Sequence, residues 1–159
     1  MENLIIFGAR YLTAVMILIA GVYFLRQARE KKIEMVMFAI ITLPAIFLIS
    51  RIASLLYFNP RPFVVGNFVP LIEHANNNGF PSDHTLLSAA IAMVIFFYNK
   101  KLGSLLLFLA LLVGVARILA GVHHALDIAG SFAIACTVAF LMYEFVLPKI
   151  LNNKKFKKL

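Results

Sequence analysis

Five apolar runs, separated by short charged or polar segments, dominate this chain of 159 residues. They cover residues 4–25, 34–57, 84–98, 102–120 and 124–147. Their lengths are close to the roughly 20 apolar residues that a helix needs to cross a bilayer. Because 62% of its residues are hydrophobic, the chain cannot cover itself with the polar surface of a soluble domain. The sequence therefore predicts an all-α integral membrane bundle of about five transmembrane helices.

The apolar runs use nearly the whole length, which leaves no room for a second domain. We expect one transmembrane domain over residues 1–148, followed by a basic tail over residues 149–159. The first run contains Arg10 and lacks both a basic leader and a small-residue cleavage site, so it is interpreted as a retained helix. Cys136 is the only cysteine and lies in an apolar run, which excludes an intramolecular disulfide.

The positive charges predict how the chain crosses the membrane. Every lysine lies between the first and second runs, between the third and fourth, or after the fifth: Lys31, Lys32, Lys100, Lys101, Lys149, Lys154, Lys155, Lys157 and Lys158. With five spans these clusters share one side, which the positive-inside rule makes cytoplasmic. The polar motifs then face outward from a cell membrane, and the C-terminus is cytoplasmic. Basic residues at the ends of apolar runs also argue against nucleic acid as a partner.

His123 and Asp127 open the fifth run at a spacing of four, which would place them on one helix face. A carboxylate there fixes the tautomer of the imidazole and leaves its other nitrogen free to attack. A purely structural hydrogen bond explains the pair alone equally well. Arg117 ends the fourth run, and its guanidinium fork matches phosphate oxygens, although a lone arginine there would simply snorkel. The helix must break for Arg117 to reach His123, and Gly121 is the expected break.

The third run starts with a second polar motif. Ser82 follows Pro81 and is the expected N-cap, with Asp83 in the first helical turn. Free amide groups at a helix start attract anions, so Ser82 can cap the helix, bind phosphate or alternate between the two. His84 is placed to protonate a leaving oxygen. Its structural alternative is a histidine at the headgroup boundary.

Two further arginines precede this motif. Arg61 lies between two prolines that restrict its backbone, which makes it a candidate phosphate ligand. Arg51 lies inside the second apolar run, where an ionised group is costly and normally faces a polar cavity. We expect Arg51 to line the floor of the site, with a structural ion pair as the main alternative. The neighbouring loop residues Glu73 and His74 are interpreted as a solvated pair, with contact to the substrate as the alternative. No cluster has the spacing of metal ligands, so no metal or other cofactor is expected.

Together these residues resemble the signature of the type-2 phosphatidic acid phosphatase superfamily, membrane branch. Its motifs are Lys-(x6)-Arg-Pro, Pro-Ser-Gly-His and Ser-Arg-(x5)-His-(x3)-Asp. Arg61-Pro62 matches the end of the first motif, residues 81–84 match the second, and residues 117–127 match the third with its spacing intact. The combination is highly specific, although each part alone is not.

Three positions depart from that signature. Ser54 stands at the lysine of the first motif, Asp83 at the glycine of the second and Ala116 at the serine of the third. Arg51, one helical turn before Ser54, is a candidate replacement for the lysine. Asp83 places a negative charge beside phosphate, which is useful only if it contacts an arginine or takes part in proton transfer.

The Phe-Pro-Ser-Asp-His sequence is similar to that of bacitracin-resistance-type undecaprenyl pyrophosphate phosphatases within this family. The resemblance implies that His123 attacks the terminal phosphorus to give a phosphohistidine and that His84 protonates the departing lipid phosphate. It further implies that Arg61, Arg117 and Ser82 hold the phosphoryl oxygens without a metal. The expected activity is hydrolysis of undecaprenyl pyrophosphate, a polyprenyl lipid in the bilayer, to undecaprenyl phosphate.

Several alternatives remain open at this point. The motifs recognise phosphate and not the lipid, so the substrate can also be phosphatidate, phosphatidylglycerophosphate or a lipid A-type phosphate. Transfer of the phosphoryl group to an acceptor other than water fits the same residues. With the lysine lost at Ser54, the chain can also be a non-catalytic protein that binds lipid phosphates, although the nucleophile, its carboxylate, the acid and two arginines all remain. A channel is the weakest alternative, because the polar groups gather at one face and do not trace a path across the bilayer.

Overall fold

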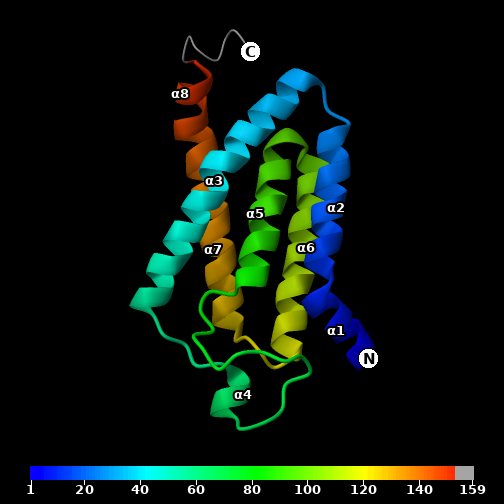
Figure 1. Ribbon diagram of the computed structural model, residues 1–159, viewed down its shortest axis with the longest axis vertical. Helices are drawn as coiled ribbons and strands as arrows, with labels where there is room; N and C mark the ends of the chain where they lie inside the picture. The colour runs from blue at the N-terminus through cyan, green and yellow to red at the C-terminus, as the bar shows by residue number, and fades with distance from the viewer. Residues whose placement is uncertain (153–159) are drawn as a thin grey trace.

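The computed structural model describes residues 1–152, and the regular elements in that range are helical (Figure 1). They are α1 (Glu2–Arg10), α2 (Leu12–Leu25), α3 (Arg29–Leu56), α4 (Pro62–Val65), α5 (Asp83–Tyr98), α6 (Lys100–Leu119), α7 (Ala125–Leu141), the π-helical turn η1 (Met142–Val146) and α8 (Leu147–Leu151). The predicted all-α bundle is confirmed. Four lysines of the predicted tail, Lys154, Lys155, Lys157 and Lys158, lie outside the described residues.

The long helices have the length and composition of membrane spans. Three apolar helices are long enough to cross a bilayer, namely α3, α6 and the continuous segment Ala125–Leu151, and the bent pair α1–α2 makes a fourth. Large apolar side chains cover the outside of these helices, among them Ile40, Phe47, Leu48, Phe108 and Phe140. Such a surface needs lipid as its solvent. The chain is a multi-pass membrane protein.

The sequence predicted one helix over residues 4–25, whereas the structure has two helices there. This segment is divided at Tyr11 into α1 and α2, whose axes differ by 49°. The carbonyl of Ala9 lies at the bend and accepts a hydrogen bond from Arg117 Nη1 at 3.2 Å. Gly8 brings α1 close to α6, since a Cβ on Gly8 would lie 2.9 Å from Cβ of Ala116. The bend therefore follows from contacts with a helix more than 100 residues later in the chain.

Helix α5 forms the centre of the bundle. It contacts α2, α3, α6 and α7 and has 16 residues, which corresponds to about 24 Å of helix. Its buried side chains are mostly small, including Ser88, Ala89, Ala90 and Ala92. Small residues let neighbouring helices approach closely. The polar motif at the start of α5 is consequently surrounded by the other helices of the bundle.

The two ends of the bundle differ in chemistry (Figure 1). The turns that carry Lys31, Lys32, Lys100 and Lys101 lie at the end where α2 meets α3 and α5 meets α6. The long loop of residues 57–82 and the turn from α6 to α7 lie at the other end. That loop contains α4, which the sequence analysis did not predict because its prolines were interpreted as helix breakers. Pro62 occupies the first turn of α4, where a missing N–H is tolerated.

The close contact between α5 and α6 gives a stability prediction. A Cβ on Gly103 would lie 2.2 Å from Cα of Phe96, and backbone atoms cannot move aside cheaply. We expect Gly103→Ala to destabilise the fold by about 1–3 kcal/mol, measured as a lower thermal midpoint in detergent. Gly21→Ala is the matched control, because nothing lies within 4 Å of its added Cβ. Equal midpoints for the two variants would contradict this account of the packing.

Candidate active site

The turn between α6 and α7 brings the third motif together. Gly121 has φ of +78°, a backbone conformation that favours glycine, and it ends α6 as predicted. His123 precedes α7, which starts at Ala125, so the prediction that His123 and Asp127 share one helical face is wrong. Their contact forms across the helix entry instead. Asp127 lies in the first turn, and its Oδ2 accepts from His124 N at 2.9 Å and lies 3.2 Å from His123 Nδ1.

The surroundings of His123 define its tautomer. Arg61 Nη1 lies 3.2 Å from His123 Nε2. A guanidinium can only donate, so Nε2 carries a lone pair, and the ring proton resides on Nδ1, which donates to Asp127. Burial lowers the pKa of His123 below its usual value, against the opposing effect of the Asp127 hydrogen bond. The imidazole is therefore neutral, oriented, and nucleophilic at Nε2.

Asp127 is held by donors on both of its oxygens. It is fully buried, and Asn59 Nδ2 donates to Oδ1 at 2.7 Å. Asn59 comes from the loop after α3, so this bond joins the first and third motifs. The sequence analysis missed Asn59. Its position two residues before Arg61 was the available signal.

Arg61 links the loop to the nucleophile and is almost completely buried. Its Nε donates to Asn77 Oδ1 at 2.9 Å, Nη1 to Val122 O at 2.8 Å, and Nη2 to Asn78 O at 3.2 Å. The predicted phosphate ligand thus lies directly against His123 but bonds to protein groups in this conformation. Phosphate binding at Nε2 requires Nη1 of Arg61 to turn from the imidazole to a phosphoryl oxygen.

Arg117 has donors free for an anion. Its side chain is 3% exposed, and its Nη1 donates to the Ala9 carbonyl. Its Nε and Nη2 are buried and have no hydrogen-bond partner among residues 1–152. Unpaired buried donors on a cation are costly, and an anion placed beside them would remove that cost. This geometry fits the predicted role of Arg117 as a phosphate ligand.

Ser82 and His84 are placed differently from each other. Ser82 is the N-cap residue of α5 as predicted, but its side chain does not cap the helix. The hydroxyl is fully buried and accepts from Thr85 Oγ1 at 3.2 Å. His84 is half-buried and lines a pocket of about 340 Å³ with Arg117, Arg10 and other residues. Of the two residues, His84 is the one that opens onto the site.

His74 is closer to the chemistry than the sequence analysis suggested. Its ring centroid lies 6.0 Å from that of His123, in an edge-on arrangement. Burial, with the charges of Arg61 and Arg117, lowers the pKa of His74 to about 4. His74 lines the pocket of His84 and also a second pocket of about 170 Å³. The interpretation of His74 as part of a solvated loop pair is wrong, since its ring lines both pockets and lies edge-on to His123, as the alternative of a substrate contact requires.

The second pocket contains the two remaining candidates, Arg51 and Asp83. Arg51 Nη2 lies 3.0 Å from Asp83 Oδ1, and the side chains are 50% and 62% exposed. Arg51 thus lines this pocket and also forms the ion pair that was the main alternative to a role in the site. Asp83 therefore contacts an arginine, which was one of the two roles expected for it.

Asn78 organises the loop and was also missed. Its Oδ1 accepts from Asn59 N and Phe80 N, and its Nδ2 donates to Ser54 O, Ser54 Oγ and Tyr57 O. The sequence analysis treated this asparagine only as a turn signal. Ser54, at the position of the family lysine, is thus used to anchor the loop to the end of α3.

Comparisons with known proteins place the chain in a family. The family model of the PAP2 superfamily matches residues 53–150, which include all three motifs. The chain is 34% identical over 146 residues to undecaprenyl-diphosphatase BcrC of Bacillus subtilis, covering 91% of this chain and 75% of that protein. It is 35% identical over 151 residues to bacitracin transport permease protein BcrC of Bacillus licheniformis, covering 94% and 73%.

A solved structure has the same fold. The crystal structure of a transmembrane PAP2-type phosphatidylglycerolphosphate phosphatase from Bacillus subtilis superposes with a TM-score of 0.58 at 22% identity. The similarity covers 96% of this chain and 76% of that one. It supports the arrangement of the helices described above.

Proposed function

The chain belongs to the PAP2 superfamily, and on that basis we propose that it hydrolyses undecaprenyl diphosphate to undecaprenyl phosphate and inorganic phosphate. The observation that carries the proposal is the line of contacts from Asp127 through His123 to Arg61. It presents a neutral imidazole nitrogen beside a cation that binds phosphoryl oxygens. Such an arrangement suits a nucleophile that attacks phosphorus.

The proposed reaction has two steps. In the first, His123 Nε2 forms a bond to the terminal phosphorus, and the bond from that phosphorus to the bridging oxygen breaks. His84 gives its proton to the bridging oxygen, which leaves with the lipid phosphate. In the second, water attacks the phosphohistidine and the bond between phosphorus and nitrogen breaks. Inorganic phosphate leaves, His123 is again neutral, and one proton from water returns to His84.

The remaining residues hold the phosphoryl group through this sequence. Arg117 supplies buried donors without protein partners, and Arg61 supplies Nη1 once it turns from His123. Positive groups placed where charge develops stabilise a phosphoryl-transfer transition state. Ser82 contributes at the start of α5, where free amide groups favour an anion. The reaction as proposed needs no metal ion.

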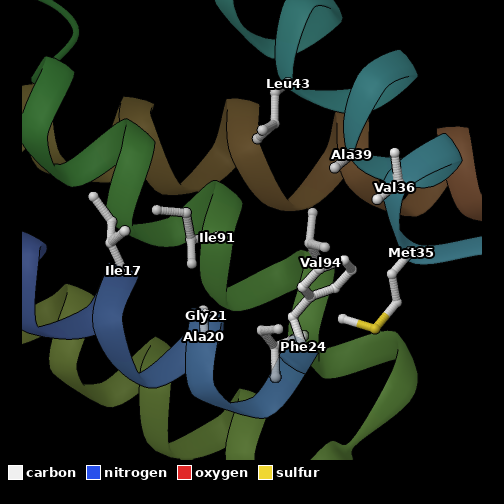
Figure 2. Close-up of a pocket in the computed structure, with 11 residues that line it drawn as sticks. Ile17, Ala20, Gly21, Phe24, Met35, Val36, Ala39, Leu43, Ile91 and Val94 are labelled. Atoms are coloured by element: carbon white, nitrogen blue, oxygen red, sulfur yellow. The ribbon is translucent and has the colours of Figure 1, made fainter. Parts of the chain in front are cut away.

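An apolar groove among α2, α3 and α5 supports a lipid substrate (Figure 2). Its volume is about 280 Å³, and apolar side chains line it, including Ile17, Phe24, Met35, Leu43 and Ile91. It fits a hydrocarbon chain that lies in the membrane while the phosphate lies at the polar end of the bundle. A lateral opening of this kind serves polyprenyl and acyl chains alike.

The positive-inside rule supports an outward-facing site. The described lysine-bearing turns lie at the end of the bundle opposite the site (Figure 1). With the lysines in the cytoplasm, the phosphatase site faces the outside or the periplasm, and the chain ends in the cytoplasm. An outward site fits recycling of a carrier lipid that is released there.

The test is phosphate release in detergent with a metal chelator present. Undecaprenyl diphosphate is compared with phosphatidate and phosphatidylglycerophosphate. We expect chelator-resistant release with the highest kcat/KM for the diphosphate. A preference for either monophosphate lipid would overturn the substrate, and loss of activity with chelator would overturn the metal-free mechanism. No release from any lipid by folded protein would instead favour a binding protein.

A further inference from the structure

Three pockets that share lining residues lie between Arg61, which contacts the nucleophile His123, and the apolar surface of α2 and α3. The polar pocket beside Arg61 shares Arg51 and Asp83 with an apolar pocket of about 250 Å³ between α3 and α5. Apart from that pair, the apolar pocket is lined by Leu43, Ile46, Phe47, Leu86, Leu87 and Ala90. It shares Leu43 with the groove of Figure 2. The ion pair of Arg51 with Asp83 therefore lies where the polar path becomes apolar.

A lipid with its phosphate at His123 and its chain in this groove must pass the ion pair. In a lipid monophosphate the group at that position is an ester or glycerol oxygen, whereas in a diphosphate it is a second phosphate. We propose that Arg51 binds the lipid-side phosphate of a diphosphate, which displaces Asp83, and that this exchange makes the site selective for diphosphates. The inference rests on the proposed function and specifies its substrate class.

The ion pair has the properties that such an exchange needs. Both side chains are at least half exposed, and exposed ion pairs contribute little to stability, so a phosphate displaces the carboxylate readily. The guanidinium of Arg51 lies 4.8 Å from the centre of the Phe47 ring, which holds it in place when Asp83 leaves. A planar guanidinium also matches two phosphate oxygens better than an ammonium does.

Asp83 explains how a monophosphate would be disfavoured. When the substrate has no second phosphate, Arg51 stays in its ion pair with Asp83, and the substrate gains no contact with that arginine. Ser54, at the lysine position of the family, is bonded to Asn78 and carries no charge. Among the described residues of α3, Arg51 is thus the cationic side chain that lines this pocket.

The test is Arg51→Gln, assayed with farnesyl diphosphate and phosphatidate. We expect kcat/KM for the diphosphate to fall by about tenfold or more, mainly through KM, because a charge-assisted contact is lost. The value for phosphatidate should change by less than about twofold. Arg10→Gln is the matched control, since Arg10 lines the other pocket, and it should leave the ratio of the two substrates unchanged. Equal losses on both substrates in Arg51→Gln would overturn the proposal.

A binding measurement separates this inference from the proposed function. Methylenediphosphonate is not hydrolysed, so its effect on the thermal midpoint reports binding without turnover. We expect it to raise the midpoint of the wild type more than phosphate at equal concentration, and Arg51→Gln to lose that difference while melting normally without ligand. Equal effects of the two ligands on the wild type would refute the second subsite. If the wild type binds the diphosphonate but hydrolyses no lipid, the proposed function fails and the subsite stands.

Discussion

Replacing His123 with alanine is expected to lower the rate of phosphate release by about four orders of magnitude, because the attacking atom is removed. The methyl group of alanine supplies no oriented nitrogen beside phosphorus. The variant should still bind substrate, because Arg117 and Arg61 remain. The loss therefore appears in kcat, measured with undecaprenyl diphosphate under saturating conditions.

His124→Ala is the matched control for this result. His124 adjoins the nucleophile in sequence, but its Nε2 lies 3.1 Å from Pro60 O, away from the phosphoryl site. Its backbone N–H, which binds Asp127, is kept in the variant. Substrate labelled at the terminal phosphate is mixed with enzyme and quenched rapidly in alkaline detergent, because the P–N bond of phosphohistidine is labile in acid and survives in base. A labelled protein should be trapped with the wild type and with His124→Ala only. A label on His123→Ala would show that another residue is the nucleophile.

The helices were largely predictable because the bilayer fixes their length and polarity. The apolar run of residues 84–98 and helix α5 (Asp83–Tyr98) agree to within one residue. The bend at Tyr11 was not predictable, since it depends on Arg117 donating to the Ala9 carbonyl. Apolar composition indicates that a segment lies in the membrane, but not where a distant side chain interrupts its backbone hydrogen bonds.

The site shows the same division between local and distant information. Spacing along the chain predicted that Gly121 would break the helix and that His123 would meet Asp127, because only a few residues separate them. The contacts of Asn59 and Asn78 join segments far apart in sequence, and the local signals at these two residues do not identify their partners. Short-range motifs thus identify the reacting groups, whereas the groups that hold them in place appear only in the folded chain.

Asp127→Asn is expected to lower kcat by about 10³-fold, although the variant changes only one atom of the side chain. Each partner of the carboxylate is a donor: Asn59 Nδ2 at Oδ1, and His124 N and the His123 ring at Oδ2. An amide has one oxygen, so its NH₂ group must face one of these donors. If it faces His123, Nδ1 becomes the acceptor and the ring proton moves to Nε2.

That tautomer cannot attack phosphorus, and its Nε2 proton would point at Arg61 Nη1, a second donor 3.2 Å away. Repulsion between these two donors also displaces the Arg61 guanidinium from its position beside His123. Asn59→Ala is the informative comparison, because it removes one donor and leaves the carboxylate, so a much smaller fall in kcat is expected. If Asp127→Asn kept wild-type kcat, the amide oxygen would have to face His123, and Asn59 would have to turn its own amide to accept. The double variant Asp127→Asn with Asn59→Asp tests the orientation of this amide. An acceptor at position 59 favours the orientation in which the amide oxygen faces His123 and the Nδ1 proton is kept. The double variant should therefore regain part of the rate that Asp127→Asn loses.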